Sequence, residues 1–231
     1  NIIREMAQMN IKLNSNKINN NSIFFDVDTQ HDYLSEASKK KIKDSAEVKR
    51  NLAKLTNYAI ENNIKILGSV DIPSNKNMVI DNNINIETRN KMQETFVQRT
   101  IFVPNRKVDE QLISKALQSN SPVLVEKQAY SCFQNPNTDT IVEIIKNSND
   151  ITKKKTSNET IITAVVYGVA TEYCVKEAVL GLLSRGLKVL LVKDAIGAIN
   201  EELAKEALRE MKEAGAITLG SKDLIITKEI I

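Results

Sequence analysis

Reactive side chains follow several of the apolar runs that are typical of buried strands. Asp28 follows "IFFDV", Asp71 follows "KILGSV", Lys127 follows "VLVE", and Cys174 lies shortly after "AVVYG". In an open parallel sheet the carboxyl ends of the strands meet at one edge, where such sheets place their sites. The pattern therefore predicts that carboxylate, ammonium and thiol groups meet at one edge of a sheet.

These groups are sufficient for acyl transfer without a histidine. If Thr171 caps a helix, Cys174 lies in its first turn, where free N–H groups favour an anion, and Lys127 lowers the thiol pKa further. Asp28 can accept the thiol proton and pass it to a leaving amine. N–H groups around Ala170 and Cys174 can hold an oxyanion. Each residue alone also has a structural interpretation, as packing, a turn or solvated surface, so the hypothesis rests on the coincidence of three strand ends.

Strands that alternate with helices would position these groups. The strand-like runs are continuous rather than alternating, which favours a parallel sheet covered on both faces. We expect residues 1–21 to form a loose arm outside a single domain of residues 22–231, and Asn200 to cap a helix. Strands are predicted at 22–27, 64–70, 99–103, 121–127, 160–168, 187–192 and 216–221. Helices are predicted at 46–63, 108–120, 137–149, 171–185 and 200–215, with Gly186 and Gly215 ending the last two.

The composition narrows the class of protein. The 231 residues are 42% hydrophobic and 26% charged, as in ordinary soluble domains. The net charge of +3 and the 4% aromatic content do not favour nucleic-acid binding. No apolar run approaches the ~20 residues that span a membrane, and the beginning of the chain lacks a signal-peptide pattern. Two cysteines are too few for a disulfide framework, so we expect a cytoplasmic protein.

The single histidine, His31, excludes many kinds of site. A zinc site with two or three histidines cannot form, and the chain contains no HExxH, CxxC, GxxxxGK[ST] or GxGxxG motif. We expect His31 at the surface or at the rim of a pocket. Cys132, in "YSCFQNP", competes with Cys174 for the role of nucleophile. Cys174 is favoured because no helix start directly precedes Cys132.

Three segments together resemble the isochorismatase-like cysteine hydrolases, and nicotinamidases most closely. They are "DVDTQHDY" (26–33), "EKQAYSCFQNPN" (126–137) and "VVYGVATEYCVKEAVLGLLSRGLKVLLVKDAI" (165–196). The resemblance implies an α/β three-layer sandwich, with a six-stranded, mainly parallel sheet and helices on both faces.

The same resemblance implies roles for individual residues. Asp28 would be the general base, Lys127 the second member of a triad, and Cys174 the nucleophile. A cis peptide bond would join Val169 to Ala170, and the N–H groups of Ala170 and Cys174 would form the oxyanion hole. Residues in the matching motifs would line the substrate pocket, namely Tyr33, Asp71 and Tyr130.

The chain departs from the nicotinamidase pattern at the metal site. Nicotinamidases hold a metal with an aspartate and histidines, beginning with S-x-D-x-H. Here the corresponding stretch is "SVDIP", so Asp71 remains while Pro73 stands in place of the histidine. We therefore expect no metal and no cofactor. Metal-free relatives often hold a substrate carboxylate with arginine, which makes Arg89 and Arg99 candidates for that role.

The sequence thus predicts a metal-independent cysteine hydrolase that cleaves a C–N bond of a small-molecule amide through a thioester on Cys174. Two alternatives stay open. One is a true nicotinamidase, which converts nicotinamide to nicotinic acid and orients the ring with other groups. The other is a non-catalytic family member whose pocket has drifted. The expected partners are a small amide and further copies of the chain, without nucleic acid or membrane.

Overall fold

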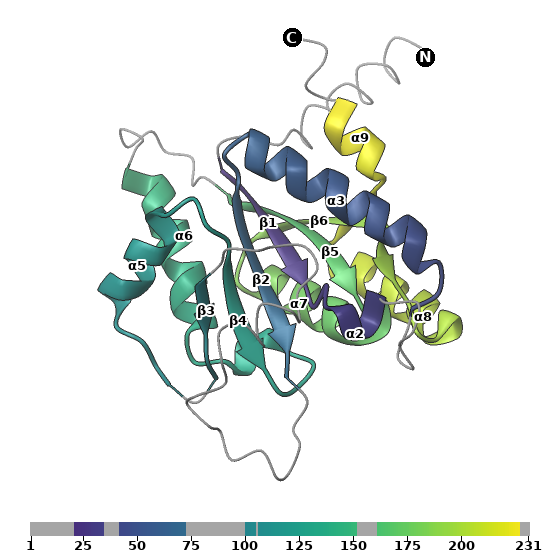
Figure 1. The fold of residues 1–231 in the computed structure, drawn as a ribbon, viewed down its shortest axis with the longest axis horizontal. Coiled ribbons are helices and arrows are strands. Elements are labelled where there is room, and N and C mark those ends of the chain that lie inside the picture. Colours follow the sequence, from purple (N-terminus) through teal and green to yellow (C-terminus); the bar gives the residue numbers. More distant parts are fainter. Residues whose placement is uncertain (1–20, 35–41, 73–99, 105, 152–160, 227–231) are drawn as a thin grey trace.

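The computed structural model describes residues 21–34, 42–72, 100–104, 106–151 and 161–226 (Figure 1). Residues 1–20 of the predicted arm and most of the polar segment between Asp71 and Thr100 lie outside these ranges. Among the described residues, no helix is long and apolar enough to cross a membrane.

The centre of the fold is a seven-stranded sheet in which every strand pairs in parallel with its neighbours. The strand order is β3-β4-β2-β1-β5-β6-β7. The parallel sheet confirms the predicted fold class. It has seven strands, whereas the resemblance implies six. The strands are β1 (Ser22–Val27), β2 (Lys65–Asp71), β3 (Thr100–Phe102), β4 (Val123–Lys127), β5 (Thr163–Val169), β6 (Lys188–Gly197) and β7 (Ile217–Leu219).

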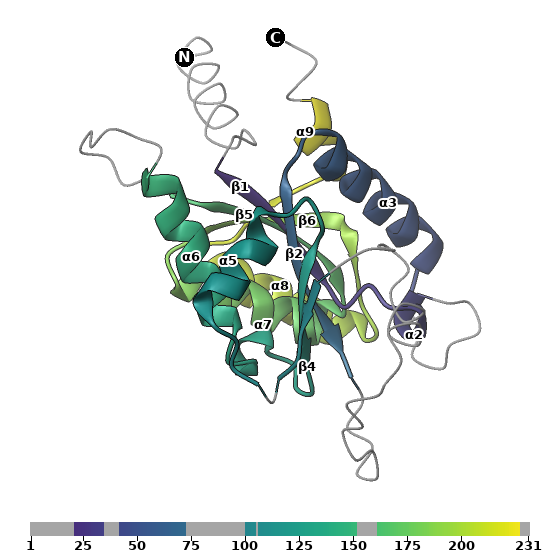
Figure 2. The same cartoon turned by 60° about the vertical axis from the view of Figure 1, so that its left-hand side comes forward.

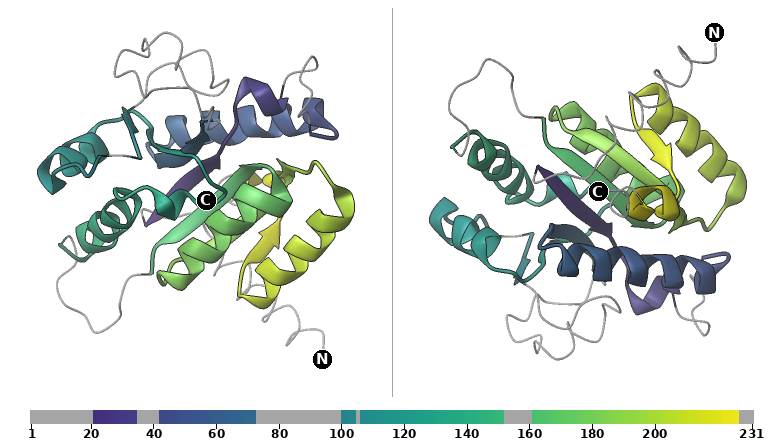
Figure 3. Two further views of the ribbon diagram at one scale, coloured as in Figure 1. Left: turned by 90° about the horizontal axis from the view of Figure 1, so that it is seen from below. Right: turned by 90° about the horizontal axis from the view of Figure 1, so that it is seen from above.

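Helices cover both faces of the sheet, and the views along its edges show three layers (Figures 2 and 3). One face carries α5 (Glu110–Gln118), α6 (Thr138–Ile151), α7 (Lys176–Ser184) and α8 (Glu201–Glu213). The other face carries α3 (Ser45–Glu61) and α9 (Ser221–Ile226), with the short α2 (His31–Leu34) beside α3.

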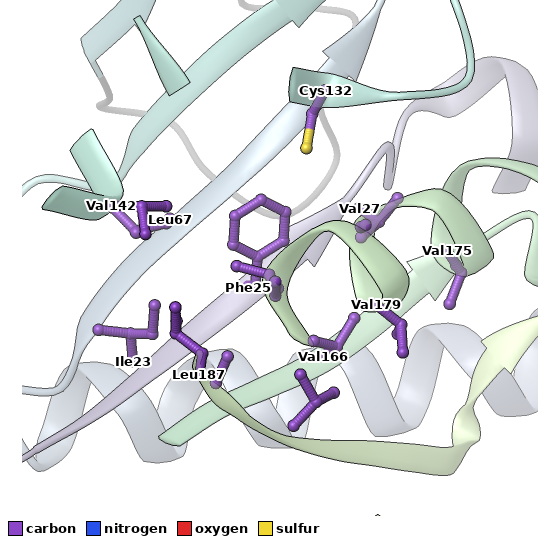
Figure 4. Packing of buried hydrophobic residues seen from close by; sticks show 14 of the residues in the cluster. Ile23, Phe25, Val27, Leu67, Cys132, Val142, Val166, Val175, Val179 and Leu187 are labelled. Atoms are coloured by element: carbon purple, nitrogen blue, oxygen red, sulfur yellow. The ribbon is translucent and has the colours of Figure 1, made fainter. Parts of the chain in front are cut away.

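The central strands are buried on both faces, which explains their continuous apolar runs. Phe25, Val27 and Val166 point to one side and pack against α7 residues such as Val179 (Figure 4). Their neighbours along the same strands, among them Phe24, pack against α3 on the other side. Burial of this apolar surface is the main force that holds the layers together.

Several predicted boundaries are confirmed. The Asn200 side chain accepts hydrogen bonds from the N–H groups of Glu202 and Leu203 and so caps α8. Gly186 and Gly215 follow α7 and α8 with φ of 79° and 110°, a left-handed conformation that favours glycine.

The helix expected at 171–185 is confirmed, although its first turn, η2 (Thr171–Val175), is π-helical before the chain continues as α7. Other predicted boundaries are wrong. The strand expected at 216–221 ends at Leu219, and α9 begins at Ser221. There the Asp194 carboxylate accepts hydrogen bonds from the backbone N–H and the hydroxyl of Ser221. Asp194 and Ser221 are 27 residues apart in the sequence, so the local pattern, which indicated a strand up to residue 221, could not show that a helix starts there.

Candidate active site

Four adjacent strands deliver the predicted chemical groups to one edge of the sheet. Lys127 and Asp71 end the neighbouring strands β4 and β2, Asp28 follows β1, and Cys174 follows β5. The chain leaves β1 towards α3 on one face and leaves β5 towards α7 on the other. The group therefore lies where the chain changes direction across the sheet, which is the usual place for a site in this architecture.

Lys127 joins Asp28 to Cys174. Its Nζ atom lies 2.7 Å from Oδ2 of Asp28 and 3.2 Å from Sγ of Cys174. The Asp28 carboxylate is also within hydrogen-bonding reach of the thiol. Asp28 and Lys127 are almost completely buried, and Cys174 is 7% exposed. The three predicted triad residues are thus in mutual contact in a site that largely excludes water.

The turn after β1 fixes the direction of the Asp28 side chain. Asp28 has a φ of 50°, and its backbone N–H donates to the Ser69 carbonyl at 3.0 Å. The Ser69 hydroxyl donates to Oδ1 of Asp28 at 2.7 Å, which leaves Oδ2 to face Lys127. Ser69 therefore holds both the backbone and the carboxylate of Asp28.

The turn that carries Cys174 follows directly on β5. The peptide bond between Val169 and Ala170 is cis, as the resemblance implied. The backbone N–H groups of Tyr173 and Val175 both donate to the Ala170 carbonyl at 3.1 Å. Cys174 lies between these two donors, inside the π-helical turn.

Two side chains that precede Cys174 anchor this turn to the end of β6 and to the residues that follow it. The Thr171 hydroxyl donates to the Gly197 carbonyl at 3.0 Å, so the prediction that Thr171 caps the helix is wrong. The buried Glu172 carboxylate accepts the N–H groups of Ile199 and Asn200 at 3.0 and 2.6 Å. The nucleophile candidate is therefore held from the start of α8 as well as from β5.

The charges of the site differ from the sequence-based expectation in one respect. Burial raises the pKa of the Cys174 thiol above its usual value, and the negative charge of Asp28 adds to this effect, while Lys127 opposes it. The predicted lowering of the thiol pKa is thus wrong for the resting site. The cause is desolvation, which outweighs the nearby cation.

Lys127 nevertheless stays positively charged. Burial by itself lowers the pKa of Lys127, but the charges of Asp28 and Asp71 raise it above the usual value for a lysine. Burial also raises the pKa of Asp28, against the influence of Lys127. The resting site therefore pairs a neutral thiol with a carboxylate that has an increased affinity for a proton.

Asp71 and Tyr33 lie beside the triad. Oδ1 of Asp71 is 3.7 Å from Nζ of Lys127, and Oδ2 accepts a hydrogen bond from the Tyr33 hydroxyl at 2.6 Å. The Gln30 side chain bonds to both the N–H and the carbonyl of Asp71, at 2.7 and 2.8 Å. Of the predicted pocket residues, Asp71 thus lies beside Lys127 of the triad, and Tyr33 contacts Asp71.

The third predicted pocket residue, Tyr130, lies further out. Its side chain is 59% exposed and stacks on the Tyr173 ring, with 4.9 Å between the ring centroids. Since Tyr173 precedes Cys174, this pair of rings places an aromatic surface next to the turn that carries the thiol.

The described part of the site does not fit a metal ion. Both carboxylate oxygens of Asp71 already face a hydrogen-bond donor or a cation. Within the described ranges, no group of three or more His, Cys, Asp or Glu side chains gathers in a way that could bind a metal. The side chain of His31 and the residues Pro73, Arg89 and Arg99 lie outside the described part, so their predicted roles are untested.

Cys132 is buried in the apolar layer close to the site, near enough for the charges of Asp28 and Lys127 to act on its thiol. The expectation that no helix start directly precedes Cys132 is wrong, because a short helix, η1 (Cys132–Gln134), does start at Cys132, with Ser131 as its cap. The Cys132 thiol points into the apolar layer near Phe25 (Figure 4). Burial raises the pKa of this thiol to about 12. Burial raises the pKa of both cysteine thiols, so the pKa does not separate them. The preference for Cys174 rests on its contact with the Lys127 ammonium at 3.2 Å and on its greater exposure, 7% against 1% for Cys132.

Gln30, Ser69 and Tyr173 contribute to the site without having been predicted as site residues. Gln30 lies two residues after Asp28 in the first of the matching segments, and Ser69 lies two residues before Asp71 in "SVDIP", the stretch that corresponds to S-x-D-x-H. That spacing is a signal that could have identified them. Nothing in the local sequence indicates the stacking of Tyr173 on Tyr130.

Residues 22–223 match the model of the isochorismatase domain, and the chain belongs to this family. The match covers all the strands and the whole candidate site. No curated protein matches the chain.

Solved structures share this fold. The MAR1 ribonuclease from Caenorhabditis elegans is 21% identical, with a TM-score of 0.58, and the match covers 91% of this chain and 82% of that one. Nicotinamidase PncA from Bacillus subtilis is 19% identical, with a TM-score of 0.55 and coverages of 86% and 98%. The pyrazinamidase of Pyrococcus horikoshii in complex with zinc is 22% identical, with a TM-score of 0.55 and coverages of 87% and 99%. At these identities the similarity establishes the fold.

Proposed function

We propose that this protein is a cysteine hydrolase that cleaves the C–N bond of a small amide through a thioester on Cys174. The observation that carries the proposal is the position of the Lys127 ammonium, 2.7 Å from the Asp28 carboxylate and 3.2 Å from the Cys174 sulfur. A proton acceptor, a cation and a thiol in mutual contact are the parts that an acyl-transfer reaction requires.

The first half of the reaction forms the thioester. Asp28 takes the proton of the Cys174 thiol, and the thiolate attacks the carbonyl carbon of the amide. The developing oxyanion faces the backbone N–H groups of Ala170 and Cys174. Asp28 then gives its proton to the leaving nitrogen, the C–N bond breaks, and ammonia or an amine departs.

The second half regenerates the enzyme. Asp28 accepts a proton from a water molecule, whose oxygen attacks the thioester carbon. The C–S bond breaks, the carboxylic acid product leaves, and the thiolate regains the proton from Asp28. Lys127 remains protonated throughout, since the raised pKa keeps its charge in place beside the thiolate. The raised pKa of Asp28 suits both steps, because the same group must accept and return a proton.

The contacts of Asp71 support a reaction that does not use a metal. A cation bound to Asp71 would have to displace the Tyr33 hydroxyl and approach the Lys127 ammonium. We infer that Asp71 and Tyr33, together with Tyr130 at the outer edge, contact the substrate instead. The charge of Asp71 favours substrate groups that donate hydrogen bonds.

The test is ammonia release from a panel of small amides and ureides, nicotinamide among them. Cys174→Ala should abolish turnover, and the matched variant Cys132→Ala should retain most of it. If the Cys132 variant is inactive and the Cys174 variant active, the assignment of the nucleophile is wrong.

The same panel separates the alternatives. Efficient turnover of nicotinamide would identify a nicotinamidase that orients its substrate without a metal. No turnover of any amide, together with a Cys174 thiol that resists iodoacetamide near neutral pH, would indicate a non-catalytic member of the family.

A further inference from the structure

A second carboxyl group, that of Asp26, is buried behind the site and takes no part in the proposed reaction. Asp26 lies on β1, opposite Gly68 of β2 and Tyr167 of β5. Its side chain is completely buried and shares a face of the strand with Phe24, on the side covered by α3. A titratable group in an apolar layer is costly unless it has a partner or a neutral form.

The only side chain whose hydrogen bond to Asp26 is resolved among the described residues is that of Thr29. The Thr29 hydroxyl donates to Oδ1 of Asp26 at 2.7 Å, and its backbone N–H also faces the carboxyl group. Within the described ranges, the other oxygen, Oδ2, is buried without a hydrogen-bond partner. An oxygen without a donor stabilises a negative charge poorly, so this environment favours the neutral form.

Thr29 directly follows Asp28, so the contact between Asp26 and Thr29 spans the residue that is proposed as the base. Asp28 occupies a left-handed conformation, with its N–H on the Ser69 carbonyl, and its own carbonyl accepts the N–H of Gln30 at 2.7 Å. The hydrogen bond between Thr29 and Asp26 holds the turn of Asp28 from the opposite face of the sheet. A change in the charge or position of the Asp26 side chain can therefore affect Asp28 in two ways, through the backbone between residues 26 and 29 and through the electric field.

We propose that Asp26 is a positioning residue for the candidate triad: it holds the turn of Asp28 through Thr29, and its charge sets how readily Asp28 takes the proton of Cys174. The inference rests on the proposed function for its importance to turnover, but its effect on the thiol can be measured without any substrate.

The direction of the effect follows from the charges. Burial raises the pKa of Asp26 to about 7, the hydrogen bond from Thr29 opposes this, and the charge of Asp28 raises it further. Tyr167 faces Asp26 from β5 and is kept neutral by burial, with the uncharged Thr56 hydroxyl of α3 beside it. Tyr58 of α3 stacks on Phe24 in the same layer, and burial raises the pKa of its phenol. The interaction of two carboxyl groups is mutual, so an ionised Asp26 makes Asp28 hold a proton more tightly. The proton that Asp28 takes up is the one released by the Cys174 thiol. Ionisation of Asp26 therefore increases the fraction of Cys174 that is thiolate.

The experiment follows the alkylation of Cys174 by iodoacetamide, read from the mass of its peptide, from roughly pH 6 to 8. In the wild-type protein the rate should show a step of at least about twofold centred near the Asp26 midpoint, beyond the general increase of thiol reactivity. Asp26→Asn keeps the size of the side chain and an acceptor for Thr29 but cannot ionise, so the step should vanish. An unchanged profile in this variant would overturn the proposal.

Thr29→Val provides the matched control, since it keeps Asp26 and removes the hydroxyl donor. Loss of the hydrogen bond should move the step to higher pH by roughly half a unit or more. The carboxyl-carbon NMR signal of Asp26 in the wild-type protein gives a direct check that needs no variant to fold. A titration midpoint near the ordinary value of an aspartate would refute the proposal, whatever the outcome of the amide screen.

Discussion

Lys127 stands between Asp28 and Cys174, with its ammonium 2.7 Å from the carboxylate and 3.2 Å from the sulfur. The charge is buried and its pKa is raised by its acidic neighbours, so it is present at every pH at which the protein would work. A fixed cation lowers the energy of the thiolate and of the negative charge that follows it in the reaction.

Lys127→Met should therefore lower kcat by about a hundredfold or more, because the thiolate loses its only close cation among the described residues. It should also reduce the free energy of unfolding by about 3–5 kcal/mol, since Asp28 remains buried without its partner. Initial rates of ammonia release and urea unfolding measure the two effects. Lys127→Arg keeps the charge and should lose less activity than Lys127→Met. Equal activity in the wild type and Lys127→Met would contradict the proposed role.

Tyr33 holds one oxygen of Asp71, and the loss of its hydroxyl tests whether this pair binds the substrate. Tyr33→Phe keeps the ring and removes the donor at 2.6 Å from Oδ2. The value of kcat/KM should fall about tenfold, the worth of one hydrogen bond to a charged group. The alkylation rate of Cys174 should stay close to that of the wild type, because the triad itself is unchanged.

Metal removal tests the same pair from another direction. Dialysis against a chelator should leave the ammonia-release rate of the wild-type protein unchanged, since both oxygens of Asp71 are already engaged. A loss of activity that zinc restores would show that Asp71 exchanges Tyr33 for a metal, and would contradict our account of this residue.

Gly181 allows the helix after Cys174 to approach η1 closely. A Cβ atom at this position would lie 2.2 Å from a ring carbon of Phe133, and the Arg185 guanidinium lies over the same ring, 3.6 Å from its centroid. Gly181→Ala should therefore lower the free energy of unfolding by about 1–3 kcal/mol through overpacking. Urea unfolding gives the value. The double variant Gly181→Ala with Phe133→Leu should recover part of the loss, and additive losses would show that the two residues are not coupled.

The strand ends could be predicted from the sequence because continuous apolar runs are a strong local signal and parallel strands share one direction. That was enough to bring Asp28, Lys127 and Cys174 together. The start of α9 could not be predicted, because it depends on Asp194, 27 residues away in the sequence. The hydrogen bond of the Thr171 hydroxyl could not be predicted for a similar reason, since it is donated to the carbonyl of Gly197 at the end of another strand.

The protonation state of Cys174 could not be predicted from the sequence for a different reason. The helix start and the lysine at a neighbouring strand end both predicted a lowered thiol pKa, and neither feature tells how deeply the sulfur is buried. Desolvation depends on how completely the rest of the chain covers the sulfur, and here it is the largest influence on the pKa. A motif specifies which groups meet, whereas burial decides which of them carries the proton.

Asp26 leads to a prediction about stability and pH. Burial raises its pKa from the usual 3.8 to about 7, while the unfolded chain keeps the ordinary value. The folded state therefore binds this proton more tightly than the unfolded state does. The resulting stabilisation is complete below about pH 4 and is lost as the pH rises through 7, with a total of about 4 kcal/mol. Urea unfolding over this pH range should show the decline, superimposed on the titration of the other groups.

Asp26→Asn isolates the contribution, because the amide occupies the same space and carries no titratable proton. The difference in unfolding free energy between wild type and variant should change steadily from pH 4 to 7, as the wild type alone loses the stabilisation of its bound proton. The absolute stability of the variant does not enter this test, since only the pH dependence of the difference is compared. Parallel curves for the two proteins would mean that Asp26 titrates as an ordinary aspartate, and that its oxygens have partners which neutralise the cost of burying a charge behind Asp28.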